Sequence, residues 1–355
     1  MRKPRLFSVL AAGLAAAITL NSQAAQKDTF SVCWTIYAGW MPWEYGATQG
    51  IVDKWAKKYG INIDVVQLND YVESINQYSA GQFDGCTMTN MDALTIPAAG
   101  GIDSTALIVG DFSNGNDGVV LKGEKKTLAD LKGQNVNLVE LSVSHYLLAR
   151  GLEKAGLSER DLKVVNTSDA DMVAAFATQD VTAVTTWNPL LAEIEATPGV
   201  TKVFDSSQIP GEIIDLMVVN SDTLKDNPAL GKALTGAWYE IMATMSDSGA
   251  AGQAAREHMA KASGTDLQSY EAQLATTKMF YSAKDAVAFT KSPRLPETMS
   301  KVAAFSFTHG LLGEGAQSAD AIGMSFAGDV TTGDQGNLKL RFDPTYMQMA
   351  ADGQL

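Results

Sequence analysis

Flat aromatic side chains and carboxylates occupy the loops that follow several strand-like segments of this chain. Half of the six tryptophans fall between Trp34 and Tyr45, in a run that glycine and proline interrupt. Aromatic rings offer rigid faces to a planar or cationic molecule, and carboxylates accept hydrogen bonds from its edge. The side chains that we expect to bind a ligand are Tyr37, Trp40, Trp43, Asp92, Asp111, Glu140, Ser142, Trp187, Glu212 and Asp215.

Lysine and arginine are missing from every segment that carries these side chains. A site for nitrate, a sulfonate or an amino acid normally holds the anionic group with a fixed positive charge, although helix N-termini can substitute. Guanidinium, a planar cation with a fork of N–H donors, suits carboxylates at its edge and aromatic rings on its faces. The loops therefore favour guanidinium. The segments are 37–45, 87–97, 110–118, 140–146, 185–191 and 211–215.

Urea is the second candidate ligand, because it has the same planar shape and a similar set of N–H donors. It is neutral, and its carbonyl oxygen would need hydrogen-bond donors as well. Asn90, Ser144 and Asn188 lie in the same segments and could supply them.

Each of the candidate side chains also has an ordinary structural interpretation. Aromatic clusters commonly pack in the core, and Trp34 lies within a strand-like segment. Asp111 and Asp117 stand in a Gly/Asn-rich stretch that is typical of turns. Asp92 and Glu140 follow strands at positions where a helix begins, so both could cap a helix instead of binding a ligand.

The N-terminal segment has the pattern of a secretory signal peptide. A basic start, Arg2–Arg5, precedes the apolar stretch Leu6–Leu20, and small residues follow before Ala24. The apolar stretch is too short to span a bilayer comfortably. We therefore expect residues 1–24 to be removed and the mature chain to be periplasmic.

Charge and cysteine content narrow the partners and the covalent structure. The formal net charge is −13, which repels nucleic acid and anionic membranes, so neither is expected as a partner. The two cysteines, Cys33 and Cys86, both lie in strand-like segments. They could form a disulfide if those strands are neighbours, but the geometry is demanding across parallel strands, and we favour buried free thiols.

Strand-like and helical segments alternate along the first two thirds of the chain, as they do in parallel α/β sheets. The predicted strands are 29–36, 61–68, 86–89, 102–109, 135–139, 162–166, 183–186, 203–204 and 213–219, and the predicted helices are 44–59, 71–80, 144–155 and 170–177. The chain exceeds the usual size of a single core, so two lobes are expected. They are a first lobe at 25–120, a second lobe at 121–214, and a return to the first lobe with a helical C-terminal region at 215–355.

Four short motifs follow one another in a characteristic order on a chain with a predicted signal peptide. They are Tyr37–Pro42, Lys57–Gly60, Ser79–Gly85 and Leu128–Gly133. From Thr29 to Asn220 the chain resembles the periplasmic solute-binding proteins of ABC importers, in the nitrate/sulfonate/taurine-like group. The resemblance implies a type II periplasmic-binding-protein fold with a ligand cleft between two lobes. It also implies a small-molecule ligand, an ABC permease in the inner membrane as partner, and a monomer.

Three further segments resemble a narrower clade within that group. They are Gly39–Trp43, Asn69–Tyr78 and Asp84–Leu94. Members of the clade are importer components encoded beside urea carboxylase-type enzymes, so the resemblance implies urea or guanidine as the substrate. The predicted function is therefore capture of a small nitrogen-rich solute for import. The alternative within the group is a binding protein for a nitrate-, sulfonate- or taurine-type anion.

Catalytic motifs do not emerge from the sequence. His145, His258 and His309 are far apart and show no metal-ligand spacing, and the chain contains no phosphate-binding or dinucleotide-binding loop motif. We therefore expect no enzymatic activity, no metal and no cofactor. A pyrimidine-precursor enzyme on the same fold is the alternative from another class, and the signal peptide and the lack of clustered histidines disfavour it.

Overall fold

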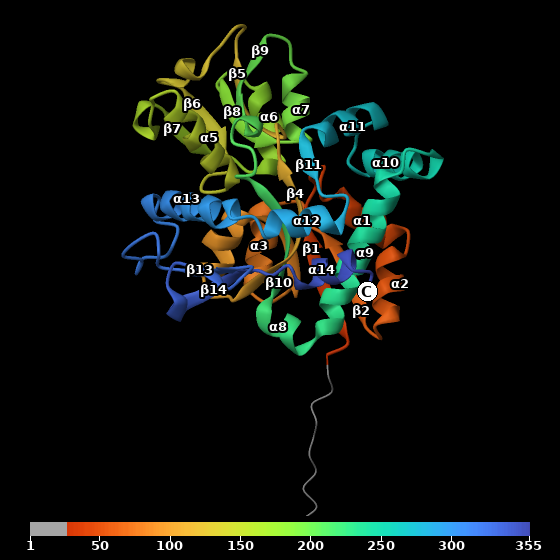
Figure 1. The fold of residues 1–355 in the computed structure, drawn as a ribbon. Helices are drawn as coiled ribbons and strands as arrows, with labels where there is room; N and C mark the ends of the chain where they lie inside the picture. Colours follow the sequence, from red (N-terminus) through yellow and green to blue (C-terminus); the bar gives the residue numbers. More distant parts are fainter. Residues whose placement is uncertain (1–26) are drawn as a thin grey trace, which may run out of the picture.

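The computed structural model describes residues 27–355, which form two β-sheets surrounded by helices (Figure 1). The predicted signal peptide, residues 1–24, lies outside the described residues. The larger sheet has the strand order β13 (Val330–Thr332), β12 (Gly323–Phe326), β14 (Leu338–Phe342), β4 (Ser104–Ser113), β10 (Ile214–Asn220), β3 (Gly85–Thr89), β1 (Thr29–Trp34) and β2 (Asn62–Gln67), and β11 (Thr277–Met279) pairs with β4. The smaller sheet has the order β7 (Lys163–Asn166), β6 (Asn135–Leu138), β8 (Ala183–Trp187), β5 (Asp117–Lys122) and β9 (Val200–Asp205).

Helices connect the strands and cover the sheets. Those next to the smaller sheet are α5 (Val143–Lys154), α6 (Met172–Ala177) and α7 (Leu190–Glu195). The others are α1 (Met41–Thr48), α2 (Ile51–Lys58), α3 (Tyr71–Ser79), α4 (Asn90–Ala93), α8 (Ser221–Asp226), α9 (Pro228–Ser246), α10 (Ala250–Ala262), α11 (Leu267–Ala275), α12 (Ala283–Thr290), α13 (Arg294–Thr308) and α14 (Thr345–Ala351). We call the larger sheet with its helices the first lobe, and the smaller sheet with α5–α7 the second lobe. The predicted α/β class is confirmed.

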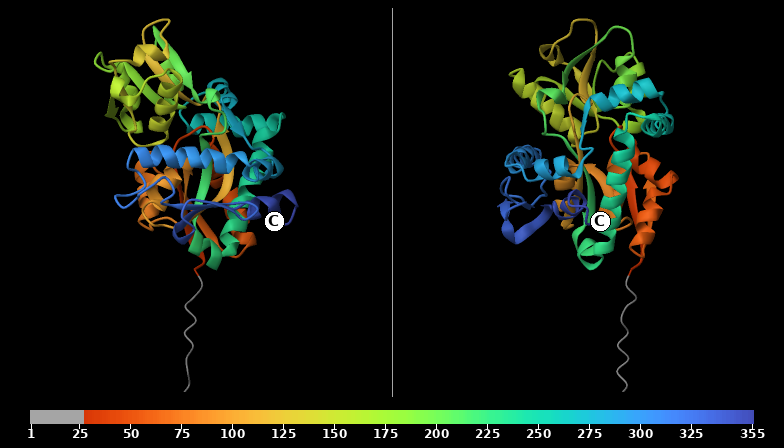
Figure 2. Two further views of the ribbon diagram at one scale, coloured as in Figure 1. Left: turned by 60° about the vertical axis from the view of Figure 1, so that its left-hand side comes forward. Right: turned by 45° about the vertical axis from the view of Figure 1, so that its right-hand side comes forward.

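The chain passes between the two sheets twice, once from β4 to β5 and once from β9 back to β10. Figure 2 shows both lobes and the strands that run toward the junction between them. β4 and β10 are antiparallel neighbours, so the two crossings leave the first lobe side by side. Polar side chains near the ends of these strands are thereby brought to the junction.

The Cys33 and Cys86 side chains form a disulfide, and the preference for free thiols was wrong. β1 and β3 are adjacent parallel strands, and their register places Cys33 directly opposite Cys86. The two Cα atoms lie 4.4 Å apart, at the short end of the range that a disulfide can bridge. The sequence alone does not reveal the register, which decides between a pair and two free thiols.

The predicted helix 44–59 is two helices, α1 and α2. Gly50 separates them with φ +70°, a left-handed conformation that ends one helix without the steric cost that other residues carry. The break lets α1 follow the aromatic run and α2 lie against α9. The continuous apolar pattern across the break concealed it.

The C-terminal segment also belongs to the first lobe. β14 pairs with β4 in parallel, and Leu340 and Phe342 are buried in the core, although residues 328–355 show no motif. The predicted lobe boundary after residue 120 falls inside β5, whose whole length lies in the smaller sheet. A hydropathy search over residues 27–355 finds no helix that could span a bilayer.

Candidate functional site

A small cavity lies at the junction of the lobes, enclosed by aromatic and acidic side chains. Its volume is about 20 Å³, which is little more than one water molecule needs. Side chains from both lobes close it, since Trp187 ends β8 while Tyr37 follows β1. The lining residues are Tyr37, Trp40, Tyr71, Thr89, Asp117, Val143, Trp187, Ile213 and Asp215.

Tyr37 connects two aspartates on neighbouring strands. Asp111 on β4 and Asp215 on β10 are register partners, and the Tyr37 hydroxyl lies 2.9 Å from Asp111 Oδ1 and 3.0 Å from Asp215 Oδ2. Burial raises the pKa of the Asp111 carboxyl to about 7. Burial and the neighbouring charge of Asp111 raise the pKa of Asp215 well above its usual range. The pair therefore resists losing both protons until a cation compensates the charge.

Gly39 permits this close approach. A Cβ atom at this position would lie 2.6 Å from Asp111 Oδ2 and 2.5 Å from a ring carbon of Tyr37. Only glycine lets the backbone of the aromatic loop pass so near the carboxylate without displacing it.

Two more buried aspartates complete the acidic surroundings. Asp117 accepts a hydrogen bond from the Ser113 hydroxyl, and burial raises the pKa of its carboxyl to about 7. Asp92 accepts hydrogen bonds from the Tyr71 hydroxyl at 2.7 Å and the Thr89 hydroxyl at 2.8 Å. Burial raises the pKa of Asp92 to about 6. We call Asp92, Asp111, Asp117 and Asp215 the cavity carboxylates.

Aromatic rings from both lobes form a continuous wall. Trp40 meets Tyr37 edge-on with ring centroids 5.0 Å apart, and it lies 5.8 Å from Tyr71. Tyr71 in turn meets Trp187 of the second lobe at 5.6 Å. Such rings can contact the faces of a flat ligand while oxygen atoms contact its edge.

Several buried polar atoms in this region, both acceptors and donors, have no hydrogen-bond partner among the described residues. Asp92 Oδ1 and Asp111 Oδ2 are buried and have no hydrogen-bond partner among the described residues. Trp40 Nε1 is a buried donor in the same situation. Of the described residues that line the cavity, none is a lysine or an arginine. The arrangement can therefore accept several N–H bonds and a positive charge.

The structure places Tyr37, Trp40, Trp187 and Asp215 on the cavity, and Asp92 and Asp111 directly behind it through their tyrosine partners. Four other predicted residues lie elsewhere. Trp43 packs against Trp238, Ser142 caps α5, Glu140 is exposed, and Glu212 pairs with cations.

Glu212 shows why an acid near the cleft need not face it. The Arg150 guanidinium donates to Glu212 Oε2 at 2.9 Å, Lys301 Nζ lies 3.0 Å from Oε1, and the Tyr146 hydroxyl donates at 2.7 Å. Although burial works in the opposite direction, these hydrogen bonds hold the pKa of Glu212 below its usual range. Glu212 is therefore a neutralised link between α5 and α13.

Sequence reasoning missed Tyr71 and Thr89, and it left Asp117 out of the predicted site because the surrounding stretch is typical of turns. Thr89 ends β3 and caps α4, while Tyr71 begins α3 just after β2. Both lie at the carboxyl end of a strand, which is the position from which the other site residues were predicted. Extending that rule to hydroxyl-bearing residues would have found them.

Comparisons with known proteins relate this fold to binding proteins. The chain matches the family described as NMT1/THI5 like over residues 53–245, more than half of its length. A Brucella abortus (strain 2308) protein assigned as a binding protein is 26% identical over 181 residues, which cover 50% of this chain and 56% of that protein. An Escherichia coli (strain K12) protein assigned as an aliphatic sulfonates-binding protein is 34% identical over 133 residues, 37% of this chain and 39% of that protein. The chain thus matches about half the length of these curated relatives, or less.

Solved structures share the fold over most of their length. The alkanesulfonate-binding protein SsuA from Xanthomonas axonopodis pv. citri, bound to MOPS, has a TM-score of 0.67 at 17% identity, covering 82% of this chain and 96% of that one. The periplasmic nitrate-binding protein NrtA from Synechocystis PCC 6803 has a TM-score of 0.56 at 12% identity, covering 93% and 99%. With the family match extending from α2 to α9, the chain belongs to the NMT1/THI5-like family.

Proposed function

We propose that this chain is the periplasmic substrate-binding component of an ABC importer and that it captures guanidinium. The observation that carries the proposal is the set of four buried cavity carboxylates with no lysine or arginine among the described lining residues. A planar cation would supply the missing charge and the missing N–H donors together. The importer role is supported by the fold shared with periplasmic binding proteins.

The cavity must enlarge before it admits guanidinium or any substituted guanidine, because a volume of about 20 Å³ holds little more than one water molecule. The unsubstituted ion needs the smallest enlargement and a substituted guanidine a larger one. A ligand of four heavy atoms at about 1.5 kcal/mol per atom gains roughly 6 kcal/mol, a dissociation constant of tens of micromolar. Urea has the same size but cannot supply a charge, so we expect it to bind more weakly.

An anion is the second candidate, and two observations favour it. The solved structures above are named for alkanesulfonate and nitrate. In addition, a carboxyl whose pKa is about 7 is partly protonated near neutral pH and can then donate a hydrogen bond. The two candidates respond oppositely to pH, because protonation of the cavity carboxylates would help an anion and hinder a cation.

Calorimetry on the purified mature chain tests the proposal. Guanidinium chloride, urea, sodium nitrate and taurine are titrated separately at millimolar or lower concentration, with sodium chloride as the ionic-strength control. We expect guanidinium to bind with a dissociation constant of tens of micromolar, and urea to bind at least about tenfold more weakly. Binding of nitrate or taurine without binding of guanidinium would refute the cation assignment.

A further inference from the structure

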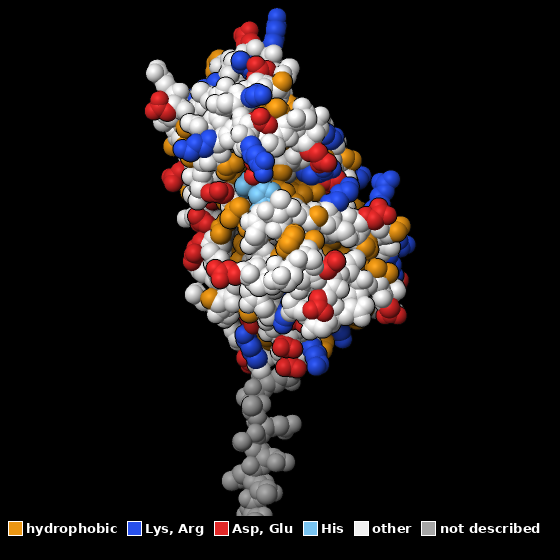
Figure 3. Space-filling model, turned by 90° about the vertical axis from the view of Figure 1, so that its left-hand side faces the viewer, with side chains coloured by type: hydrophobic (Ala, Val, Ile, Leu, Met, Phe, Trp, Pro, Cys, Tyr) orange, Lys and Arg blue, Asp and Glu red, His pale blue; other side chains and the backbone are white. Residues whose placement is uncertain are grey.

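Two histidines that are far apart in the sequence meet one glutamate where the lobes touch. His145 lies on α5 and Glu159 on the 3-10 turn η3 (Glu159–Asp161), both in the second lobe. His309 follows α13, which packs against α4 and β13 of the first lobe. Histidine side chains reach the surface at this waist of the molecule (Figure 3). No local sequence pattern reveals this cluster, because 150 residues separate Glu159 from His309.

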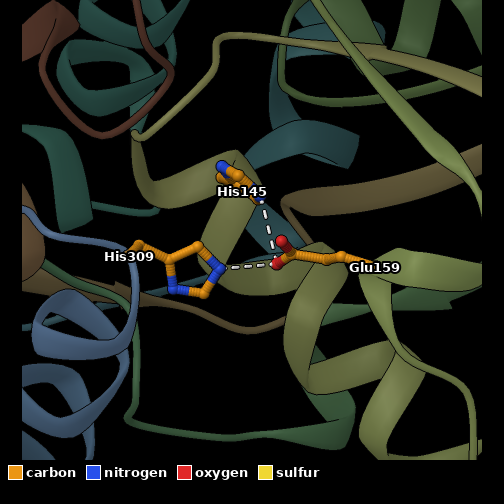
Figure 4. Close-up of side chains that lie close together, drawn as sticks. All are labelled: His145, Glu159 and His309. Carbon is orange, nitrogen blue, oxygen red and sulfur yellow. Dashed lines mark hydrogen bonds and ion pairs between the residues drawn. The ribbon is translucent and has the colours of Figure 1, made fainter.

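One carboxylate oxygen contacts both rings, as Figure 4 shows. Glu159 Oε1 lies 3.2 Å from His145 Nε2 and 2.8 Å from His309 Nε2. The hydrogen bond to His309 joins the two lobes, whereas the contact with His145 stays within the second lobe and lacks hydrogen-bond geometry. Glu159 therefore contacts one histidine of its own lobe, His145, and one histidine of the first lobe, His309.

In each ring, the hydrogen bond at Nδ1, the nitrogen that faces away from Glu159, indicates which ring nitrogens carry a proton. The Leu141 backbone N–H donates to His145 Nδ1 at 3.1 Å, so a neutral His145 carries its proton on Nε2. That nitrogen lies 3.2 Å from Glu159 Oε1 but outside hydrogen-bond geometry. His309 faces an acceptor on each side, because its Nδ1 lies 2.9 Å from the Phe305 carbonyl oxygen. A neutral ring would direct a lone pair at one of these oxygens. His309 is therefore arranged as an imidazolium.

The same hydrogen bonds argue against a metal ion. The three candidate ligand atoms lie within 4.8 Å of one another, which a metal could accept. A metal on His145 Nε2 would require that ring to lose its last proton, since Nδ1 already accepts the Leu141 N–H. Neutral imidazole, with its second nitrogen protonated, is the usual metal ligand.

The contact is partly shielded from water, since the Glu159 side chain is 30% exposed and that of His309 is 17% exposed. His145 is 3% exposed, and Phe305 stacks on His309 with ring centroids 4.1 Å apart while it meets His145 edge-on at 5.9 Å. The neighbouring His145 side chain is the main cause that holds the pKa of Glu159 below its usual range, so Glu159 is a carboxylate at neutral pH. Partial burial makes the attraction between Glu159 and His309 stronger than an exposed pair would have.

Few other charges face this contact. The groove beside it, between α5 and α13, is lined by Arg150 and Glu153 of α5 and by Lys301 of α13. Arg150 and Lys301 both bind Glu212, and Arg150 also pairs with Glu153. These charged groups are paired with one another and with Glu212, and not with the histidines.

We propose that His145, Glu159 and His309 form a proton-dependent clasp that holds the two lobes closed over the cavity. When His309 is protonated, it donates to the carboxylate across the lobe boundary. Loss of that proton at higher pH removes the positive charge and leaves a lone pair directed at one of the two acceptor oxygens, so the contact weakens and the lobes part more readily. The effect on ligand retention rests on the proposed binding function, whereas the clasp itself does not.

Long-range ¹H–¹⁵N NMR of the histidine rings tests the protonation without any ligand. The chain has three histidines, so His145→Gln, His258→Gln and His309→Gln assign every signal. At about pH 6 we expect both nitrogens of His309 to carry protons and His145 to carry its proton on Nε2. A neutral His309 ring at that pH, or equimolar Zn²⁺ binding that depends on His145, would overturn the clasp.

Small-angle scattering and binding kinetics test the closure. Glu159→Gln keeps the shape of the side chain and removes its charge. His258→Gln is the matched control, because His258 pairs with Glu44 inside the first lobe at 3.0 Å. At about pH 6 we expect Glu159→Gln, and not the control, to enlarge the radius of gyration of the ligand-free protein and to release guanidinium about fivefold faster.

The ratio of the wild-type and Glu159→Gln release rates isolates the clasp from the cavity carboxylates, which titrate equally in both proteins. We expect this ratio to approach one at about pH 8.5. Unchanged scattering together with a ratio of one at about pH 6 would overturn the proposal. If guanidinium does not bind the wild-type chain, the proposed ligand fails, and the NMR and scattering results still decide the clasp.

Discussion

Two groups of acidic side chains in this molecule have opposite surroundings. The cavity carboxylates are buried with hydroxyl groups and each other, while Glu159 and Glu212, which we call the bridging glutamates, each contact cationic or protonatable groups. Both groups lie near the junction of the lobes, and the sequence does not distinguish them. The difference is whether the protein itself supplies the positive charge.

This difference appears in the direction of the pKa shifts. Burial raises the pKa values of the cavity carboxylates, so folding disfavours their ionised form. Hydrogen bonds from neighbouring side chains lower the pKa values of the bridging glutamates, so folding favours their ionised form. Buried acids without a counter-charge destabilise a fold, and such groups are found where function requires them.

Replacing one cavity carboxylate gives the largest expected effect. Asp215→Asn should weaken guanidinium binding by at least about thirtyfold, because a charge-assisted hydrogen bond contributes about 2 kcal/mol or more. The melting temperature of the ligand-free protein should stay the same or rise, since a crowded buried acid is removed. Calorimetry and thermal unfolding measure both quantities. Binding within twofold of wild type would remove Asp215 from the site.

The pH dependence is the next largest effect. Guanidinium affinity should rise as the pH passes through about 6 and 7 and continue to rise above pH 7, because Asp92, Asp111 and Asp117 lose their protons there and the pKa of Asp215 is also raised well above its usual range. Without ligand, these raised pKa values contribute stability that is complete below about pH 4 and is lost as the pH rises through about 6 and 7. Calorimetry across this range tests the sign. Affinity that increases toward low pH would indicate an anion.

Glu212→Gln should give the opposite pattern to Asp215→Asn. We expect stability to fall by about 1–2 kcal/mol, since Arg150 and Lys301 lose a partly buried counter-charge, while the guanidinium dissociation constant stays within about twofold. Because its pKa is lowered, Glu212 contributes stability that is present at neutral pH and is lost in acid. Chemical denaturation and calorimetry measure the two effects. A large loss of affinity with normal stability would place Glu212 among the cavity carboxylates.

The smallest effect concerns the start of α5. The Ser142 hydroxyl accepts the Ser144 N–H and donates to the Val139 carbonyl, so Ser142→Ala should cost about 1 kcal/mol of stability. Glu140→Gln, at an exposed position, should change neither stability nor affinity measurably. Thermal shift with and without guanidinium compares them. Loss of binding in either variant would extend the site to this loop.

Most of the candidate residues in this region were identified by their positions at the ends of predicted strands. Asp111, Trp187 and Asp215 follow from the rule that side chains at the ends of strands gather at one edge of a sheet. Their contact with a ligand stays a prediction. Glu212 was misplaced because its partners Arg150 and Lys301 are 62 and 89 residues away, and no local pattern reveals such pairs.

The fold class could be predicted from the sequence, since local alternation of strands and helices is enough to indicate an α/β protein. The break at Gly50 and the pairing of β14 with β4 could not be predicted. The first depends on one backbone conformation inside a continuous apolar pattern, and the second on contact between segments more than two hundred residues apart. The register of β1 and β3, which allows Cys33 and Cys86 to form a disulfide, cannot be read from a single sequence either.

The disulfide between β1 and β3 makes the assembly of the cavity depend on the compartment in which the chain folds. Tyr37 follows β1 and Asp92 follows β3, so the Cys33–Cys86 bond fixes the two strands that present them. A chain folded under reducing conditions has these strands held by packing and backbone hydrogen bonds alone. Recombinant protein for ligand screening should therefore be exported or oxidised, so that a weak result can be attributed to the ligand and not to an unlinked pair of strands.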